Sequence, residues 1–164
     1  MHKRLIPLAL AAACASAAVA AGEPLVVSVK RLSMDTAVEL AQATIAACRA
    51  KGIQIGVTVV DRDGTVQVQL RDTIAAPITG PISKMKAFTA ANFNSATSAM
   101  AARAETPIGR IDGLVMSAGG LPIQVGGALI GAVGVSGAPD GATDEECAKA
   151  GLDKVAEDLE LGGE

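Results

Sequence analysis

The chain has 164 residues, of which 50% are hydrophobic and 1% aromatic, and its 14 Lys and Arg face 17 Asp and Glu, a formal net charge of −3. This length suits one well-buried domain and is short for two. An acidic balance with two phenylalanines and no Trp or Tyr provides neither a basic surface nor stacking platforms, so we expect no nucleic-acid binding.

Residues 1–21 have the pattern of a secretory signal peptide. A basic tip is followed by an apolar run and by small residues that favour cleavage after Ala20 or Ala21. An ordinary buried helix and a lipoprotein signal ending at Cys14 are the alternatives. We therefore expect residues 22–164 to form one domain that is periplasmic or secreted.

Removal of this segment changes the chemistry that the mature chain offers. His2, the one histidine, leaves together with two of the 14 basic residues, so 12 basic side chains remain against 17 acidic ones, a net charge of about −5. The usual nucleophile–base pair and the usual imidazole ligand for zinc or heme are then missing. No later run reaches the roughly 18 apolar residues of a membrane span, so we expect none in the mature protein.

Two cysteines, Cys48 and Cys147, remain in a compartment that permits disulfides. Cys48 lies in the last turn of one expected helix and Cys147 in the first turn of another. Their sulfurs meet if these helices pack antiparallel. The alternative is that they are two small buried side chains that never touch.

The hydrophobic pattern predicts, in chain order, a helix, two strands, helices, three strands and a helix. Helical spacing after a Ser33 cap marks the first helix, alternation marks the two strands after it, and a capping box of Thr143 and Glu146 begins the last helix. This order favours a single α+β domain around an antiparallel sheet. The expected ranges are helix 33–51, strands 53–59 and 65–70, a loop over 72–81, helices 83–93 and 97–104, strands 114–117, 121–125 and 128–135, and a helix from 143 to about 161.

The stretch from Gly119 to Gly137 places glycines at regular points in a β-branched, apolar run. Gly126 and Gly127 can take the positive φ values of a tight hairpin turn. Gly131 and Gly134 allow another backbone or a flat ligand to approach the second strand. The glycines lie in a hairpin rather than between a strand and a helix, so a phosphate-binding loop is not expected.

Charged clusters offer few candidates for chemistry. Asp61 and Asp63 lie in a turn where Asp commonly bonds its own backbone, too few oxygen ligands surround them for Ca²⁺, and the acidic run 144–146 is explained by the capping box. Lys84 and Lys86 stand near a helix start, where positive charge is unfavourable. They either bind an anionic group, such as a carboxylate or porphyrin propionate, or are solvated surface charges.

Several motifs follow one another in a fixed order along nearly all of the mature chain. They are the helix from Ser33, Val59-Val60-Asp61 with Gly64, Lys86-Ala87-Phe88-Thr89-Ala90, Gly119-Gly120-Leu121-Pro122-Ile123, Gly131-Ala132-Val133-Gly134-Val135-Ser136-Gly137, and Asp144 with Ala148 and Gly151. Together they resemble the GlcG/HbpS family of small heme-binding-like proteins, whose fold also occurs as the C-terminal domain of PduO-type cobalamin adenosyltransferases.

This resemblance implies a five-stranded antiparallel sheet flanked by helices, frequent homo-oligomers, and association with heme or related tetrapyrroles. The sequence departs from the family where Arg71-Asp72-Thr73-Ile74-Ala75 replaces the common Arg-Met-Asp-Gly-Ala and where Phe88 replaces a frequent Tyr. Without that phenol or a histidine, strong ligands for ferric iron are missing. Weak ligands remain in Met85, Met100, Met116, the cysteines and Thr89.

The resemblance also implies where a ligand is expected. Stacking on an apolar surface and contacts between propionates and basic side chains carry more of the affinity than an axial bond. The expected site residues are Lys84, Lys86, Thr89, Arg71, Arg110, Gly119, Gly120 and Pro122.

Three functions fit these observations. The first is an exported, non-catalytic protein that binds heme or a similar flat anionic small molecule as an accessory to sensing or transport. The second is an enzyme that acts on a small organic acid with Asp or Lys as acid–base groups. The third is an interaction module whose sheet edges form an oligomer.

Overall fold

The computed structural model describes residues 24–162, so the expected signal peptide lies outside the described part of the chain. The elements there are α1 Met34–Ala50, β1 Gly56–Asp61, β2 Val66–Arg71, α2 Thr79–Phe93, the 3₁₀ helices η1 Thr97–Glu105 and η2 Pro107–Arg110, β3 Gly120–Val125, β4 Ala128–Ser136 and α3 Gly141–Gly162. None of the helices in residues 24–162 has both the length and the apolar character needed to cross a bilayer.

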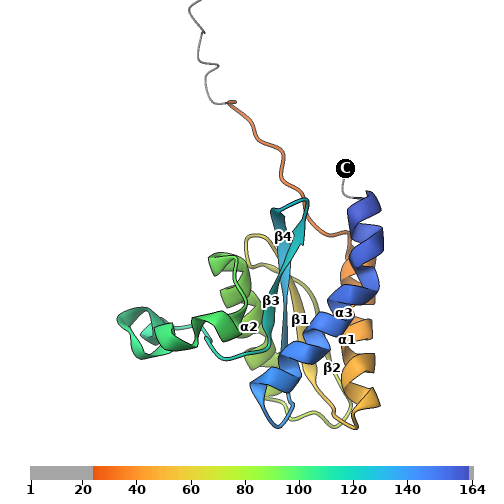
Figure 1. Cartoon of the computed structure of the whole chain (residues 1–164), viewed down its shortest axis with the longest axis vertical. Coiled ribbons are helices and arrows are strands. Elements are labelled where there is room, and N and C mark those ends of the chain that lie inside the picture. Colours follow the sequence, from red (N-terminus) through yellow and green to blue (C-terminus); the bar gives the residue numbers. More distant parts are fainter. Residues whose placement is uncertain (1–23, 163–164) are drawn as a thin grey trace, which may run out of the picture.

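The strands form one antiparallel sheet in the order β2-β1-β4-β3 (Figure 1). Helices α1 and α3 lie side by side against one face, and α2 covers the other face. The main core fills the space between the sheet and the α1–α3 pair and includes Leu40, Val59, Val133 and Val155. The smaller core beneath α2 consists of Val60, Ala87, Ala90, Ala91 and Ala132.

The predicted five-stranded sheet is wrong, because the sheet that residues 24–162 form has four strands. Residues 114–117, where the fifth strand was expected, form an irregular segment before β3. The backbone N–H of Val115 donates to the Thr89 hydroxyl at 3.0 Å instead of to a neighbouring strand. Met116 is buried, so packing explains the apolar character of this segment without a strand.

Two helix starts also differ from the expected ones. Helix α2 begins at Thr79, inside the expected loop 72–81, because Pro81 falls in its first turn, where a missing N–H breaks no intrahelical bond. Helix α3 begins at Gly141, and the Asp140 carboxylate accepts the N–H of Thr143 at 2.8 Å. The predicted capping box is therefore wrong, because Asp140 caps the helix from outside it.

Glycines on one face of the sheet allow α2 to pack with its backbone against the strands. A Cβ on Gly134 would lie 2.1 Å from the carbonyl oxygen of Ser83 and 2.5 Å from the nitrogen of Ala87. Gly56 and Gly120 face the α2 backbone in the same way. The expectation that Gly134 admits another backbone is therefore confirmed, and that backbone belongs to α2.

A disulfide joins the two helices on the opposite face. Cys48 near the end of α1 and Cys147 in the first turns of α3 are bonded, with an S–S distance of 2.07 Å across a sequence separation of 99 residues. Of the two alternatives that the sequence left open, the structure contains the disulfide.

Candidate functional site

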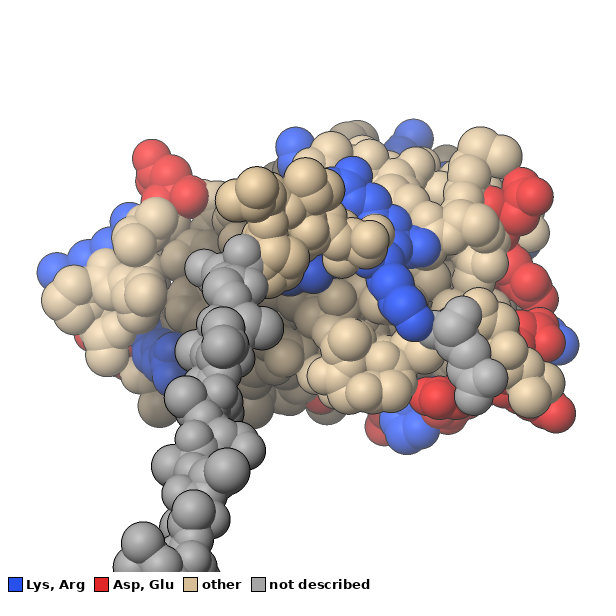
Figure 2. All heavy atoms as spheres, turned by 90° about the horizontal axis from the view of Figure 1, so that it is seen from above, with Lys and Arg blue, Asp and Glu red and all other residues tan. Residues whose placement is uncertain are grey.

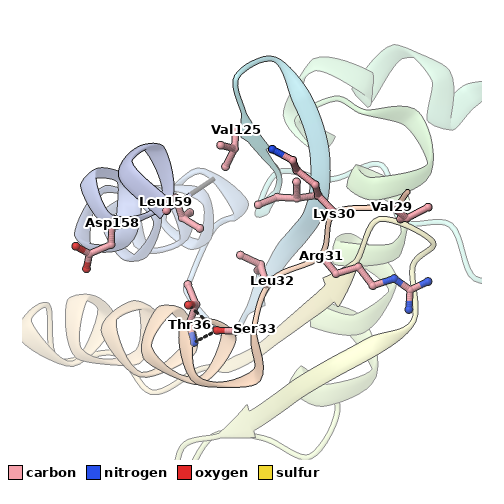
Figure 3. A pocket seen from close by; sticks show the side chains of 11 residues that line it. Val29, Lys30, Arg31, Leu32, Ser33, Thr36, Val125, Asp158 and Leu159 are labelled. Carbon is pink, nitrogen blue, oxygen red and sulfur yellow. Dashed lines mark hydrogen bonds between the residues drawn. The ribbon is translucent and has the colours of Figure 1, made fainter. Parts of the chain in front are cut away.

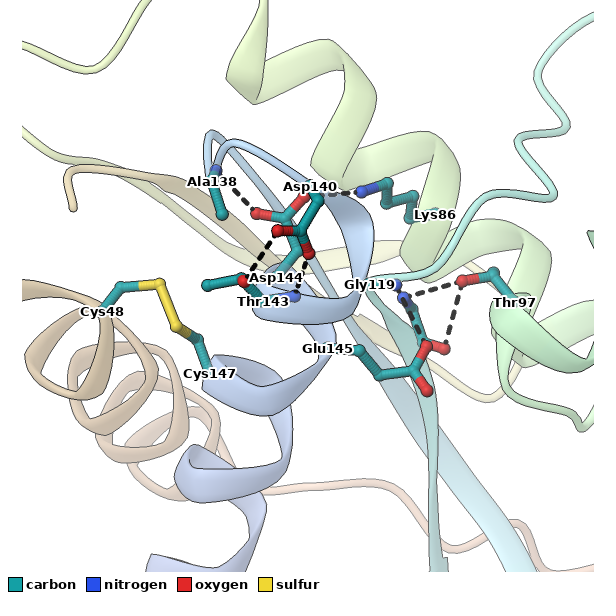
Figure 4. A network of polar contacts seen from close by, with 11 residues as sticks. Cys48, Lys86, Thr97, Gly119, Ala138, Asp140, Thr143, Asp144, Glu145 and Cys147 are labelled. Atoms are coloured by element: carbon teal, nitrogen blue, oxygen red, sulfur yellow. Dashed lines mark hydrogen bonds and ion pairs between the residues drawn. A yellow bond between two sulfur atoms is a disulfide. The ribbon is translucent and has the colours of Figure 1, made fainter. Parts of the chain in front are cut away.

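Lys86 of α2 and Asp144 of α3 form a buried ion pair beside the start of β3 (Figure 4). Lys86 Nζ donates to Asp144 Oδ2 at 2.8 Å, and the two side chains are only 4% and 5% exposed. The other oxygen of Asp144 accepts the backbone N–H of Ala138 at 2.9 Å. Burial raises the pKa of Asp144, against the opposing effect of the Lys86 hydrogen bond.

Gly119 fills the space beside this pair. A Cβ at this position would lie 2.7 Å from Lys86 Nζ and 2.9 Å from the Asp144 Cβ, so a side chain here would displace the pair. The N–H of Gly119 donates to Glu145 at 3.1 Å, and Glu145 also accepts the Ser98 hydroxyl at 2.7 Å. The network thus connects the segment before β3 with η1 and α3.

Two threonines extend the same buried region. The Gly120 N–H donates to Thr97 Oγ1 at 2.9 Å, and Thr89 Oγ1 donates to the Met85 carbonyl at 2.8 Å while it accepts from Val115. Four residues of the predicted site therefore lie in one region, and their polar groups bind other protein groups. These four are Lys86, Thr89, Gly119 and Gly120.

The other four predicted residues lie outside that buried network. Lys84 and Arg110 are exposed, on α2 and η2. Arg71 is exposed at the end of β2 and donates to the carbonyl of Ala75, whereas Pro122 lies in β3 at the opposite edge of the sheet. Their role in ligand binding stays a prediction.

The weak iron ligands are also constrained. The disulfide occupies both cysteine sulfurs, and Met100 and Met116 are buried at 3% and 6% exposure. No group of three or more His, Cys, Asp or Glu side chains within residues 24–162 is arranged to hold a metal ion.

A groove of about 540 Å³ lies at the opposite end of the sheet from the Lys86–Asp144 pair (Figure 3). It runs between the segment before α1, the β3–β4 hairpin and the end of α3. Figure 2 views this end of the molecule, where a short run of Lys and Arg side chains lies near the middle of the surface and Asp and Glu side chains gather towards one end. The apolar lining is Leu32, Val125, Ile130 and Leu159 with Val29, and the charged lining is Lys30, Arg31 and Asp158.

Arg31 is held at the rim of this groove by the turn between β1 and β2. Its guanidinium contacts Asp61 at 3.1 Å and also Asp63, and it remains half exposed. Asp61 in turn accepts the backbone N–H groups of Asp63 and Thr65, each at 2.9 Å. The predicted structural role of Asp61 in the turn is confirmed, and the same carboxylate positions a basic side chain.

None of the groove residues was predicted as part of a ligand site. The sequence signal was a basic pair, Lys30 and Arg31, between an apolar stretch and the first helix cap. That signal is weak, because the other side of the groove comes from Val125, Ile130, Asp158, Leu159 and Gly162, about 90 to 130 positions later in the chain.

Comparisons with known proteins agree with this fold. A family model described as "Haem degrading protein HbpS-like" matches residues 32–153. A double mutant of HbpS from Streptomyces reticuli is 36% identical, with 86% of this chain and 98% of that chain covered and a TM-score of 0.77. A second HbpS structure is 35% identical over 84% and 99% of the two chains, also with a TM-score of 0.77.

A PduOC structure in complex with heme is 24% identical, covers 75% of this chain and 94% of its own, and has a TM-score of 0.70, a likeness of fold alone. Among curated proteins no match was found. The family match spans the sheet and all three of the described α-helices at least in part, and the HbpS structures exceed one third identity over most of the chain. The chain therefore belongs to the HbpS-like family.

Proposed function

We propose that this protein binds heme, or a similar flat anionic molecule, without turning it over, in the groove beside the β3–β4 hairpin. We further propose that it does so after export, in the periplasm or outside the cell, where its disulfide is stable. The family match and the identity with HbpS support a heme-related ligand. The groove itself is the observation that carries the proposal.

The groove has the size and lining that such a ligand needs. Its volume of about 540 Å³ lies within the range of about 300–1,000 Å³ typical of small-molecule sites. Val29 is exposed and Val125 and Leu159 are half-buried, so these three side chains offer the apolar surface for a flat macrocycle. Leu32 and Ile130 are each only 5% exposed and form the floor of the groove. Lys30 and Arg31 at the rim offer partners for its carboxylates.

The affinity would come from this apolar contact and from the propionates. The sequence has its one His at position 2 and no Tyr, and the groove lining contains neither Met nor Cys. Arg31 is held in place by Asp61 and Asp63, so little side-chain entropy is lost when it meets a carboxylate. These two carboxylates also neutralise its charge, which lowers the electrostatic gain from a propionate.

Binding is favoured over acid–base catalysis because the buried ionisable side chains are paired with one another or with basic side chains. Among residues 24–162 these are Lys86, Asp144, Asp61 and Asp72; each forms an ion pair and none lines the groove. An enzyme that used them would need a substrate to enter a packed interior. Since the family description names haem degradation, the test follows bound heme over time.

The test is a hemin titration of the mature chain, residues 22–164, followed at the Soret band. Arg31→Gln removes one propionate partner and should weaken binding about 5-fold, the effect of roughly 1 kcal/mol. Leu159→Glu places a charge in the apolar lining and should weaken it by at least 10-fold. The matched control is Leu152→Glu, half-buried on the same helix but outside the groove, which should bind as the parent does.

Lys84→Gln and Arg110→Gln test the site predicted from the sequence. If these variants weaken binding and the groove variants do not, the ligand site belongs to the surface of α2 and η2. A parent protein with no saturable Soret change would remove the proposal for heme. Steady loss of the Soret band of bound heme would instead assign an activity to the protein.

A further inference from the structure

Residues 24–33 form an extended arm before α1, with neither helix nor strand (Figure 1). Leu25, Val26, Val27 and Val29 in this arm expose 102%, 85%, 67% and 47% of their surface. Contiguous exposed apolar residues mark an interaction surface. The β-branched valines favour an extended conformation paired with another strand.

The β3 edge of the sheet is closed to an added strand. The N–H of Val135 donates to the Gly119 carbonyl at 2.8 Å, so the alternate residues Gly120 and Pro122 direct their backbone groups outward. Thr97 occupies the Gly120 N–H, and Pro122 has no N–H to donate. An added strand at this edge would therefore have no free backbone N–H to pair with at Gly120 or Pro122.

The β2 edge is open. The N–H of Asp72 donates to the Ile55 carbonyl at 2.9 Å, so in the alternation of an antiparallel pair Gln69 and Arg71 direct their backbone N–H and C=O groups away from β1. In the described chain no backbone hydrogen bond between elements reaches these outward groups. Both residues are exposed, so this edge can template another strand.

The arm of the same chain leads away from its own β2 edge. The Leu32 carbonyl accepts Gln67 Nε2 at 2.9 Å, which holds the root of the arm near the start of β2. Val29 and Lys30 then line the groove together with Val125 at the β3–β4 hairpin. The arm thus crosses the ends of the strands towards the far edge of the sheet.

We propose that the arm of one copy pairs with the outer edge of β2 in a second copy. Each chain carries an exposed apolar segment, residues 25–29, that is not a strand of its own sheet, and a β2 edge whose outward backbone groups have no backbone partner among residues 24–162. Two copies can therefore exchange arms about a twofold axis. Backbone hydrogen bonds to Gln69 and Arg71 supply the pairing, and the valines bury their side chains beside the partner sheet. The root of the arm lines the groove, so this assembly fixes one wall of it.

The first test is the mass of the mature chain, residues 22–164, by size-exclusion chromatography with light scattering over a range of concentrations. The parent should be a dimer or closed oligomer. Val27→Asp should raise the dissociation constant of this assembly into single chains at least 10-fold. Leu161→Asp is the matched control, because Leu161 is 76% exposed and apolar but lies at the end of α3. This control should assemble as the parent does.

The second test is amide hydrogen exchange, which needs no change in the sheet. The amides of Gln69 and Arg71 should exchange slowly in the parent and at least 10-fold faster in Val27→Asp. The amides of Val68 and Leu70, which pair with β1, should be equally protected in both proteins. A monomeric parent at every concentration overturns the proposal, and so does an assembly, or an exchange rate at Gln69 and Arg71, that Val27→Asp leaves unchanged.

Discussion

Lys86 Nζ and Asp144 Oδ2 lie 2.8 Å apart in the interior, although 58 residues separate them in the sequence. The pair connects α2, on one face of the sheet, with the first turns of α3, on the other face. Both charges are removed from water, so each depends on the other. The pair therefore holds the two helix layers in register at this end of the sheet.

Loss of one member of this pair should destabilise the folded protein. Lys86→Met leaves the Asp144 carboxylate buried with one backbone donor, and we expect the free energy of unfolding to fall by about 3–5 kcal/mol. The double variant with Asp144→Asn should lose less than the sum of the single effects. Denaturant unfolding of the four proteins measures this, and a loss below about 1 kcal/mol for Lys86→Met would show that the pair is not structural.

The same pair should give stability a distinct pH dependence. Burial, the largest cause, raises the pKa of Asp144 above its ordinary value of 3.8. The folded protein therefore holds this proton more tightly than the unfolded chain, and the contribution of Asp144 falls as pH rises from 3.8 through the raised pKa. Asp144→Asn should remove this slope. The free energy of unfolding of the parent and of Asp144→Asn, measured at a series of pH values, checks this prediction. The same dependence on pH in both proteins would contradict it.

Asp72 should change the pH dependence of stability in the opposite direction to Asp144. The hydrogen bond from Arg49, at 2.7 and 2.8 Å to the two carboxylate oxygens, is the largest cause that lowers the pKa of Asp72 below 3.8. Its stabilising contribution is present above pH 3.8 and is lost as pH falls through the lowered pKa. Asp72→Asn should therefore be less sensitive to acid than the parent in that window. Equal acid sensitivity of the two proteins, followed by circular dichroism, would be the contrary result.

Reduction of the Cys48–Cys147 disulfide should destabilise the protein strongly. The bond closes a loop with a sequence separation of 99 residues, and cross-links of about this length stabilise by roughly 4–5 kcal/mol in the chain-entropy account, with about 2–5 kcal/mol typical on removal. The double Cys→Ser variant should match the reduced parent. Thiol alkylation of residues 22–164, whose cysteines are Cys48 and Cys147, followed by mass measurement with and without reductant, checks the bond. Labelled thiols in this protein without reductant would contradict it.

Close packing of α2 on the sheet predicts opposite effects at two glycines. Gly134→Ala would place a Cβ 2.1 Å from a backbone oxygen of α2, and we expect a loss of at least about 1–3 kcal/mol. Gly80→Ala in α2 meets its nearest atom at 3.9 Å and should be neutral or stabilise by up to about 1 kcal/mol. Thermal or denaturant unfolding compares them, and equal effects would show that α2 does not pack as described.

Local signals in the sequence placed most elements correctly. Apolar spacing and the Ser33 cap predicted α1 within one residue of its observed ends, and Gly126-Gly127 predicted the turn between β3 and β4, where both glycines have positive φ. The four observed strands fall where strands were expected. The extra strand at residues 114–117 was wrong, because an apolar run does not reveal whether its backbone pairs with a strand or with a hydroxyl such as that of Thr89.

The candidate site was harder to predict from the sequence than the fold was. Lys86, Thr89, Gly119 and Gly120 were predicted to bind a ligand, which stays a prediction, and in the structure their polar groups bind other protein groups. Asp144 was assigned to a helix cap, because a carboxylate in a first turn has a sufficient local explanation. Nothing in the local pattern indicates that a lysine 58 positions away reaches it.

By itself the sequence determined the family, the α+β class and the positions of most helices and strands, because these depend on motifs and periodicities that neighbouring residues carry. The tertiary structure decided the strand count, the Cys48–Cys147 bond, the burial of Lys86 against Asp144, and the groove beside the hairpin. Each of these depends on which distant segments pack together, and packing is the property that local periodicity does not specify.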